Sequence, residues 1–534
     1  MRAIAGAVAL GCVLSSTMAY AGTSCADLKS LPLGDATITQ AKSVEAGPFA
    51  VPADLGVPAQ SITLPAFCRV QGVIAPTKDS HIEFEVWLPA SGWNGKYQGV
   101  GNGGFAGSIQ YARGGLASAL IAGYAASSTD TGHRANGIDA QWALGHPEKI
   151  VDYGYRAVHE TAEKAKTIIR AFYGEPAKHS YFSSCSNGGR QALMEAQRYP
   201  ADYDGIIAGA PAANFTRILT GFTWDLLATT LDPASYIPVA KFAAIESAAI
   251  AACDARDGVK DGIIDEPSKC AFDPSVLLCK GPESDACLTT PQIAALAKIY
   301  SGPRTTKGER WYPGFQPGGE SGPGGWGLWM SGAKTAEQSA QYGFATQGAA
   351  NIIFQNAAYD YKTFSVDRDG KAADDISGRI LNAIDPDLSA FQKRGGKLML
   401  YHGWSDAALP PTATVDYYRS AASKLGKSAD SAIRLYMVPG MQHCGGGPGA
   451  DSFGTAPGVA PVEPDPSRNM SAALERWVEQ GTIPSAIVAT KYNSPAGPSS
   501  GVKFTRPLCP YPQVARYKGA GSENDAANFA CAAP

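Results

Sequence analysis

The chain of 534 residues carries 45 Lys and Arg against 48 Asp and Glu, a formal net charge of −3, and 45% of its residues are hydrophobic. This balance excludes a strongly basic nucleic-acid-binding protein and an acidic disordered chain. Gly and Pro number 60 and 37, which is rich in loops but below the roughly 25–30% of low-complexity sequences. We therefore expect a globular protein with two or three domains, or one large core with an insertion.

The first 21 residues are typical of a secretory signal peptide. One charged residue, Arg2, precedes an apolar run over residues 3–14, and A-Y-A at 19–21 forms an A-x-A cleavage site. The run is too short to span the roughly 30 Å of a bilayer, and attachment as a lipoprotein through Cys12 is an alternative. We expect an exported protein, periplasmic or extracellular, with no membrane span.

Ten cysteines remain after removal of this leader, an even number in an exported chain. Five disulfides are the simplest interpretation. A structural zinc site is disfavoured because no C-x2-C pair occurs among these cysteines. They are Cys25, Cys68, Cys185, Cys253, Cys270, Cys279, Cys287, Cys444, Cys509 and Cys531.

Residues 95–211 alternate short apolar runs with helical patterns, which is typical of βαβ units and a mostly parallel sheet. The alternation stops at about residue 214, and a cysteine-rich and Gly/Pro/Trp-rich block follows up to residue 388. It returns with two later strands and a final helix. We expect strands near residues 97–100 and at 180–183, 204–210, 397–401 and 434–437, and helices over 151–173, 190–198 and 471–480.

The sequence S-C-S-N-G-G at 184–189 lies between a predicted strand and a predicted helix, as a nucleophile elbow requires. Ser186 would occupy the tip of this sharp turn, and Gly188 and Gly189 supply the small residues that it needs. Ser184 stands where the G-x-S-x-G pattern has glycine. On this segment alone, a glycine-rich turn without a catalytic role is an equal alternative.

An acid and a histidine follow the two late strands in the order Ser, acid, His that α/β-hydrolases use. Asp406 ends Y-H-G-W-S-D, and His443 lies in V-P-G-M-Q-H-C. His402 also follows a late strand, but it sits at the strand end, where we expect it to support the acid loop.

Cysteines flank both the predicted nucleophile and the predicted base. Cys185 precedes Ser186, and Cys444 follows His443. A disulfide between them would bring the Cα atoms of Ser186 and His443 within roughly 14 Å. Together with strand context and chain order, this favours a serine hydrolase.

The chemistry assigns a role to each of these groups. His443 would take the proton of Ser186 as the hydroxyl attacks an ester carbonyl, and Asp406 would orient and stabilise the imidazolium. The oxyanion needs two N–H donors. We expect the backbone of Asn187 to supply one and Gly104, with Gly103 close behind, to supply the other.

Four segments resemble the tannase and feruloyl esterase family: C-S-N-G-G-R at 185–190, D-T-G-H at 130–133, H-C at 443–444 and the acidic loop 253–265. The resemblance runs from Cys25 to Cys531. It implies an α/β-hydrolase fold with a large inserted lid domain. With the signal peptide at 1–21 and the break in the strand and helix alternation, we expect a catalytic domain over 22–213 and 389–534 and a lid domain over 214–388. It also implies the disulfides Cys25–Cys68, Cys185–Cys444, Cys253–Cys270, Cys279–Cys287 and Cys509–Cys531.

The loop 253–265, C-D-A-R-D-G-V-K-D-G-I-I-D, is rich in oxygen ligands of the kind that calcium prefers. Its spacing is not that of an EF-hand. The family resemblance implies a structural Ca²⁺ held by the carboxylates of Asp254, Asp257 and Asp261 and by the carbonyls of Val259 and Ile263. A solvated acidic turn is the alternative. We expect no organic cofactor.

The aromatic lid segment 311–329 contains Trp326 and Trp329, which we place at the substrate, although lid core is the commoner role for such residues. Leu409, three residues after the acid, is a further candidate for packing on a substrate ring. No arginine occurs from 311 to 367, although relatives that bind a substrate carboxylate are expected to carry one in the lid. This favours neutral phenolic esters.

We therefore expect a secreted serine carboxylesterase that cleaves hydroxycinnamoyl, feruloyl-type esters through an acyl-enzyme. A tannase acting on galloyl esters and a hydrolase of mono(2-hydroxyethyl) terephthalate type are alternatives with the same mechanism. A hypothesis of another class is an inactive hydrolase fold that binds carbohydrate or phenolic polymer. The expected partner is a small or cell-wall-derived phenolic ester, with no nucleic acid, and the oligomeric state stays open.

Overall fold

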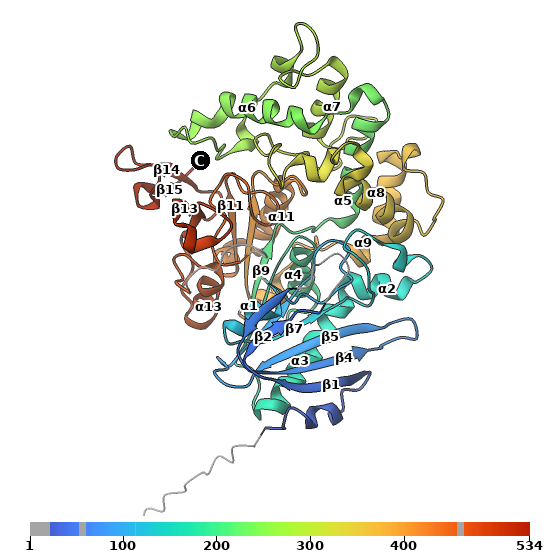
Figure 1. Ribbon diagram of the computed structural model, residues 1–534, viewed down its shortest axis with the longest axis vertical. Coiled ribbons are helices and arrows are strands. Elements are labelled where there is room, and N and C mark those ends of the chain that lie inside the picture. The colour runs from blue at the N-terminus through green and yellow to red at the C-terminus, as the bar shows by residue number, and fades with distance from the viewer. Residues whose placement is uncertain (1–21, 53–59, 113, 456–463) are drawn as a thin grey trace, which may run out of the picture.

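The computed structural model describes residues 22–52, 60–112, 114–455 and 464–534, so the predicted signal peptide lies outside the described residues. A nine-stranded sheet forms the centre of the molecule (Figure 1). Its spatial order is β1 (Ala36–Val44), β4 (Phe67–Ile74), β5 (Ile82–Pro89), β7 (Ala125–Thr129), β6 (Lys96–Val100), β8 (His179–Cys185), β9 (Gly205–Gly209), β10 (Lys397–Gly403) and β11 (Ile433–Val438).

The sheet is mixed. From β1 to β7 the neighbouring strands are antiparallel, and from β7 to β11 they are parallel. Every residue of β9 is buried, as is typical of a parallel strand covered on both faces. The predicted strands are all present, and the predicted mostly parallel arrangement holds for the half of the sheet that follows the antiparallel edge.

Helices cover both faces of the sheet. Side chains of α3, α4 and α11 share one hydrophobic core with the sheet, and side chains of α1 and α13 share the core on the opposite face. These helices are α1 (Leu116–Ile121), α3 (Ala157–Tyr173), α4 (Asn187–Arg198), α11 (Pro411–Leu425) and α13 (Met470–Gln480).

Two predicted helices begin earlier than expected. The helix predicted over 151–173 starts with α2 (Pro147–Val151), because proline is well suited to a first helical position, and continues into α3 through a π turn, Asp152–Arg156. The helix predicted from Arg190 begins at Asn187, since the glycines that indicated a turn form its first turn.

The chain between β9 and β10 adds no strand to the sheet and folds as a block of helices, seen in green and yellow above the sheet in Figure 1. This confirms an α/β fold with a large insertion, whereas the domain limits stay a prediction. The helices of the block are α5 (Phe215–Thr230), α6 (Phe242–Cys253), α7 (Thr290–Ser301), α8 (Ala340–Gln347), α9 (Lys371–Leu381) and α10 (Ser389–Lys393).

Small elements complete the fold. Three two-stranded antiparallel sheets are present, together with α12 (Ala429–Ala432). All five disulfide pairs implied by the family resemblance are confirmed. The sheets pair β2 (Gly47–Ala50) with β3 (Ser61–Leu64), β12 (Ile487–Tyr492) with β13 (Val502–Leu508), and β14 (Val514–Tyr517) with β15 (Phe529–Ala532).

One helical stretch among the described residues, Pro233–Asp257, is long and apolar enough to cross a membrane by length and composition, with a mean hydropathy of 1.4. Its last part, α6, packs Phe242 and Ile245 into the lid core. Cys253 at its end is tied to Cys270. These contacts are those of a lid helix, and the expected absence of a membrane span stays a prediction.

Candidate active site

Ser186 directly follows β8 at a strained turn. Its φ of +67° and ψ of −125° lie outside the regions that non-glycine residues ordinarily adopt, as in a nucleophile elbow. The turn is crowded, because a Cβ atom on Gly189 would lie 2.3 Å from the carbonyl oxygen of Gly209. The backbone of Ser186 is fixed by a hydrogen bond from its N–H to that same Gly209 oxygen, at 3.0 Å.

The departure from the G-x-S-x-G pattern has a structural explanation. Ser184 occupies the position where the pattern has glycine, and its side chain fills the space beside Gly188. A Cβ atom on Gly188 would lie only 1.9 Å from Ser184 Oγ. Gly188 therefore makes room for Ser184, and the elbow closes with the larger residue in place.

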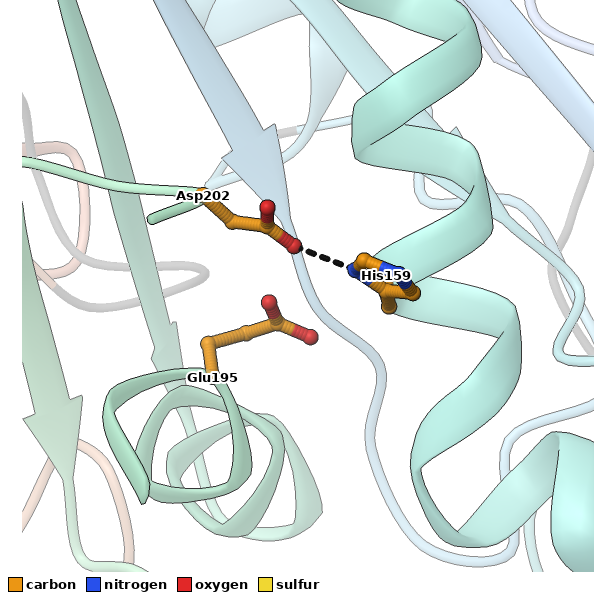
Figure 2. Close-up of side chains that lie close together, drawn as sticks. All are labelled: His159, Glu195 and Asp202. Atoms are coloured by element: carbon orange, nitrogen blue, oxygen red, sulfur yellow. Dashed lines mark hydrogen bonds and ion pairs between the residues drawn. The ribbon is translucent and has the colours of Figure 1, made fainter. Parts of the chain in front are cut away.

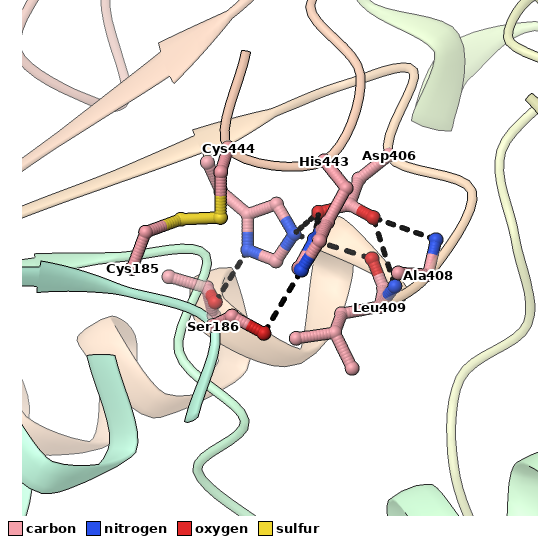
Figure 3. The surroundings of a disulfide bond; sticks show 9 residues. Cys185, Ser186, Asp406, Ala408, Leu409, His443 and Cys444 are labelled. Atoms are coloured by element: carbon pink, nitrogen blue, oxygen red, sulfur yellow. Dashed lines mark hydrogen bonds and ion pairs between the residues drawn. A yellow bond between two sulfur atoms is a disulfide. The ribbon is translucent and has the colours of Figure 1, made fainter. Parts of the chain in front are cut away.

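The structure brings the predicted nucleophile, base and acid into one hydrogen-bonded chain (Figure 3). His443 Nε2 lies 2.9 Å from Ser186 Oγ, and His443 Nδ1 lies 2.8 Å from Asp406 Oδ2. Asp406 follows β10 and His443 follows β11, so all three groups converge at the carboxyl ends of parallel strands. This arrangement can transfer a proton from the serine hydroxyl to the imidazole.

Asp406 is buried and surrounded by donors. The backbone N–H groups of Ala408 and Leu409 donate to its Oδ1 at 2.8 and 2.9 Å, and His402 Nε2 lies 3.1 Å from Oδ2. Burial alone would raise the pKa of Asp406, but the interactions with His443 and His402 outweigh it and hold the pKa below its usual range. The acid is therefore ionised, and His402, near the end of β10, contacts Asp406 as expected for a residue that supports the acid loop.

The disulfide Cys185–Cys444 joins the residues next to the nucleophile and the base, with a Cα–Cα distance of 6.0 Å (Figure 3). Cys444 also has a positive φ of 62°, like Ser186. The covalent link spans 259 residues of sequence. It holds the end of β8 against the loop that follows β11.

Gly104 and Asn187, the predicted oxyanion-hole residues, line one pocket together with Ser186 and His443. Gly104 has a φ of +55°, and a Cβ atom there would lie 2.2 Å from the carbonyl oxygen of Gly137, whereas a Cβ on Gly103 would meet nothing within 4 Å. The backbone at this point therefore requires glycine at position 104. This observation favours Gly104 over Gly103, and the donor role itself stays a prediction.

The pocket beside Ser186 has a volume of about 390 Å³, including open space at its mouth, and is almost entirely apolar. Leu409 and Trp329 line it, as predicted. The indole of Trp329 also lies edge-on to the imidazole of His443, with ring centroids 5.2 Å apart. These two predicted substrate residues are thus brought to the site.

The structure does not place Trp326 at this pocket. Its side chain is 1% exposed and packs among lid core residues, with Phe242, Tyr300 and Phe315 as ring neighbours. The π turn Gly327–Ser331 begins directly after Trp326 and carries Trp329 to the site. We therefore assign Trp326 to the lid core and not to substrate binding.

Most of the apolar lining was not identified from the sequence. Four of the lining residues belong to α5, and their i, i+3, i+4, i+7 spacing in the sequence is typical of one face of a helix. Without the fold, that face could not be distinguished from ordinary core. The additional lining residues are Phe105, Ala212, Phe215, Ile218, Leu219, Phe222, Phe344 and Ala408.

The acidic loop of the lid fits the calcium that the family resemblance implies. Among the described residues nothing donates to the buried Asp254 Oδ1. The carboxylates of Asp254, Asp257 and Asp265 line a cavity beside it, together with Glu266 and the basic side chains of Arg256, Lys269 and Arg516. Burial, with Asp261 and Asp254 as further causes, raises the pKa of Asp257 to about 6. Such a surplus of carboxylate oxygen is what a divalent cation would neutralise. The Cys253–Cys270 disulfide closes the loop.

Asp265 also lines the cavity beside Asp254, although it was not predicted from the sequence. Burial, and then the charges of Asp257 and Asp261, raise its pKa well above the ordinary value. Asp261 is different, because Arg506 Nη2 lies 2.5 Å from its Oδ2. Arg506 therefore already pairs with Asp261, whereas the other three aspartates share a cavity with Arg256, Lys269 and Arg516. The aspartate that follows G-I-I was the available signal for Asp265.

A second cluster, formed by His159, Glu195 and Asp202, could hold a metal ion by ligand type, with ligand atoms within 4.8 Å of one another (Figure 2). However, His159 Nδ1 and Asp202 Oδ2 lie 2.6 Å apart, shorter than the roughly 3.3 Å between two ligands of a tetrahedral ion. Lys166 Nζ also approaches Asp202 Oδ1 at 3.6 Å. Burial, and then Asp202, raise the pKa of Glu195 well above its usual value, which favours the protonated form of this carboxyl group over a metal-binding carboxylate.

The fold and the site define the class: an α/β-hydrolase in which Ser, Asp and His converge at the ends of β8, β10 and β11 beside an apolar pocket. The chain matches the family model described as "Tannase and feruloyl esterase" over residues 68–532, and it belongs to this family.

Individual relatives agree with this assignment. The chain is 43% identical to an uncharacterized esterase of Xanthomonas campestris pv. campestris, covering 98% of this chain and 93% of the relative. It is 35% identical to a mono(2-hydroxyethyl) terephthalate hydrolase of Piscinibacter sakaiensis, covering 89% and 86%. The crystal structure of feruloyl esterase B from Aspergillus oryzae superimposes with a TM-score of 0.85 at 29% identity, covering 95% of this chain and 99% of that one.

Proposed function

We propose that this protein is an exported serine carboxylesterase that cleaves phenolic esters of the feruloyl type through an acyl-enzyme. The observation that carries the proposal is the chain of hydrogen bonds from Ser186 through His443 to the ionised Asp406, at the mouth of an apolar pocket. Membership of the tannase and feruloyl esterase family supports ester hydrolysis as the reaction class.

In the proposed mechanism, Ser186 Oγ attacks the ester carbonyl while His443 Nε2 takes its proton. Asp406 keeps Nδ1 protonated and stabilises the imidazolium that forms. Backbone N–H groups of Asn187 and Gly104 would stabilise the tetrahedral oxyanion. His443 then protonates the leaving alcohol, and a water molecule activated by the same imidazole releases the acid from the serine.

The pocket favours a neutral aromatic acyl group. Its walls are aromatic and aliphatic, and within the described ranges no lysine or arginine lines it. Apart from Ser186, Asn187 and His443, which the chemistry requires, its side chains carry no charge and no hydroxyl or amide group. A ferulate ring with its methoxy group suits such walls better than a free carboxylate, which would lose its hydration without gaining a cation.

Calcium has a structural role in this proposal. Asp254, Asp257 and Asp261 would hold the ion with carboxylate oxygens, and Val259 and Ile263 with backbone carbonyls, as the family resemblance implies. The bound ion would supply positive charge that lets the loop carboxylates ionise together. The loop belongs to the lid, and no catalytic step depends on the ion.

Export is part of the proposal. It is supported by the sequence pattern of the first 21 residues and by five disulfides, which form and persist in oxidising compartments. A small or cell-wall-derived phenolic ester is the proposed partner.

The test is kcat/KM of the purified mature protein on methyl ferulate, methyl gallate and mono(2-hydroxyethyl) terephthalate, measured side by side. We expect methyl ferulate to be preferred by tenfold or more, which corresponds to about 1.4 kcal/mol of differential transition-state binding. Ser186→Ala is the control and should abolish turnover of all three esters. An equal or greater kcat/KM on either other ester would contradict the substrate assignment.

A further inference from the structure

Arg190, the last residue of the C-S-N-G-G-R segment, is a fully buried cation without a carboxylate partner in the part of the chain that the structure describes. Its guanidinium donates instead to neutral oxygens. Nε lies 2.8 Å from Asn187 Oδ1, and the two terminal nitrogens reach the backbone carbonyls of Gly154, Leu381 and Tyr153 at 2.8, 3.3 and 3.0 Å. Arg190 thus connects the start of α4 to the π turn Asp152–Arg156.

That π turn delivers a hydroxyl group to the predicted oxyanion hole. Tyr153 Oη lies 3.1 Å from the carbonyl oxygen of Gly104 and 3.1 Å from Asn187 Oδ1. These are the two residues whose backbone N–H groups are the predicted donors to the oxyanion. Burial raises the pKa of Tyr153 to about 12, so the hydroxyl keeps the proton that it donates. Its single hydrogen is shared between these two acceptors, so Tyr153 links the Gly104 carbonyl to the Asn187 side chain.

The D-T-G-H segment supports the same loop from the other side. His133 Nε2 lies 2.8 Å from the carbonyl oxygen of Phe105, and the His133 ring stacks on Trp142 at 3.6 Å. Trp142 in turn contacts the ring of Tyr153, with centroids 5.5 Å apart. Successive carbonyls, those of Gly104 and Phe105, are thus held by Tyr153 and His133 with one indole packed between them.

We propose that Tyr153 is a positioning residue for ester hydrolysis: its hydroxyl links the Gly104 carbonyl to the Asn187 side chain and so fixes the separation of the two predicted oxyanion-hole residues, and Arg190 fixes Tyr153. This inference rests on the proposed function. The peptide between Gly104 and Phe105 is held on both sides, because the Phe105 N–H donates to the carbonyl oxygen of Gly137 at 2.8 Å and the Gly104 carbonyl accepts from Tyr153 Oη. These two contacts fix the backbone of Gly104, a glycine with positive φ, and with it the direction of the N–H group that is the predicted donor. The π turn, an uncommon local structure that often marks functional sites, supplies the second of these contacts.

The test compares Tyr153→Phe with a matched control, Tyr436→Phe. Both tyrosines are buried, and Tyr436 also places its hydroxyl on a backbone carbonyl, that of Pro484 at 3.2 Å, away from the pocket-lining residues. The phenylalanine ring preserves the packing in each case. Steady-state kinetics on methyl ferulate, the inhibition constant of phenylboronic acid and the Tm are measured for wild type and both variants.

Loss of one direct oxyanion donor typically lowers kcat about 10²–10³-fold, and loss of its anchor should cost about tenfold. We expect Tyr153→Phe to lower kcat about tenfold and to leave KM within twofold of wild type. The inhibition constant of phenylboronic acid should rise by a similar factor, because the boronate formed on Ser186 mimics the tetrahedral intermediate. Tyr436→Phe should leave kcat and the inhibition constant within twofold of wild type. Both variants should lower the Tm by similar amounts.

Equal kinetics of the two variants, or a loss confined to KM, would overturn the inference. Ser186→Ala in the same series separates this outcome from failure of the proposed function. If Ser186→Ala abolishes turnover while Tyr153→Phe matches its control, only the role of Tyr153 is wrong. If Ser186→Ala retains turnover, the proposed function and this inference fall together. Arg190→Lys keeps the positive charge but loses the four guanidinium contacts. The folded variant should lose kcat to the same extent as Tyr153→Phe.

Discussion

Two groups of buried carboxylates in this molecule behave in opposite ways. Asp406 at the triad has its pKa held below the usual range by His443 and His402. In the lid loop, burial and neighbouring carboxylates raise the pKa of Asp257 to about 6 and that of Asp265 well above its ordinary value. At the triad the chain supplies enough donors for an anion, whereas in the loop it does not.

The difference teaches where the fold depends on something outside the chain. Asp406 lies within hydrogen-bonding distance of two backbone N–H groups and two imidazoles, which come from the end of β10 and from the loops after β10 and β11. Asp254 Oδ1 has no hydrogen-bond partner in the part of the chain that the structure describes. The triad should therefore be complete in the metal-free protein, and the lid loop should reach full stability only with calcium.

The largest effect is expected when the charge of the catalytic acid is removed. Asp406→Asn preserves the shape of the acid but removes the charge that fixes the imidazole, and kcat on methyl ferulate should fall by about 10³–10⁴. Asp257→Asn, a matched change in the lid loop, should leave kcat within about threefold at saturating calcium. Equal losses in the two variants would show that the two carboxylates do not have separate roles.

Removal of calcium tests whether the lid loop depends on a bound ion for its stability. At a calcium concentration a hundred times its Kd, binding to the native state alone contributes about 2.7 kcal/mol to the free energy of unfolding. Chelation should therefore lower the Tm measured by calorimetry. At low temperature, kcat with chelator should equal kcat with calcium. Metal analysis of protein purified without chelator should find one calcium per chain, and its absence would refute the site.

The calcium effect should also depend on pH. Asp257 has a native pKa of about 6 against an ordinary value of 3.8, so the metal-free native state binds more protons than the unfolded chain between these values. The contribution of this group to stability is therefore lost as pH rises from about 4 to 6. Because protons compete with the ion, the Tm difference between calcium and chelator should be larger at pH 7 than at pH 5. A difference that is independent of pH would contradict this account of the loop.

The smallest expected effect concerns the disulfide that joins the triad loops. Replacing both Cys185 and Cys444 with alanine frees Ser186 and His443 to separate, and kcat should fall about tenfold because small misplacements of reacting groups are costly. The matched control replaces Cys509 and Cys531, a disulfide in the C-terminal segment. Similar kcat values for the two double variants would remove the positioning role of Cys185–Cys444.

The sequence allowed much of the catalytic centre to be predicted because local patterns determine it. The strand-to-helix turn at Ser186 needs glycines within three residues, and the flanking Cys185 and Cys444 indicated which late histidine meets the serine. The five disulfide pairs followed from the family resemblance and are confirmed.

The acyl pocket was largely unpredictable, because its walls come from segments that only the fold brings together. Trp326 and Trp329 are three residues apart, and the π turn between them separates lid core from site. Tyr153 was hidden for a similar reason, since a continuous helical pattern over 151–173 gives no sign of the π turn that places its hydroxyl at Gly104.

The central claim is that Ser186 is the nucleophile, and the most direct measurement is covalent labelling. The mature protein is treated with a fluorophosphonate, and the modified peptide is identified by mass spectrometry, with Ser186→Ala in parallel. The account predicts a single adduct on Ser186, loss of esterase activity in proportion to labelling, and no adduct in the variant. Labelling of another residue, or full activity in a protein fully labelled at Ser186, would contradict it.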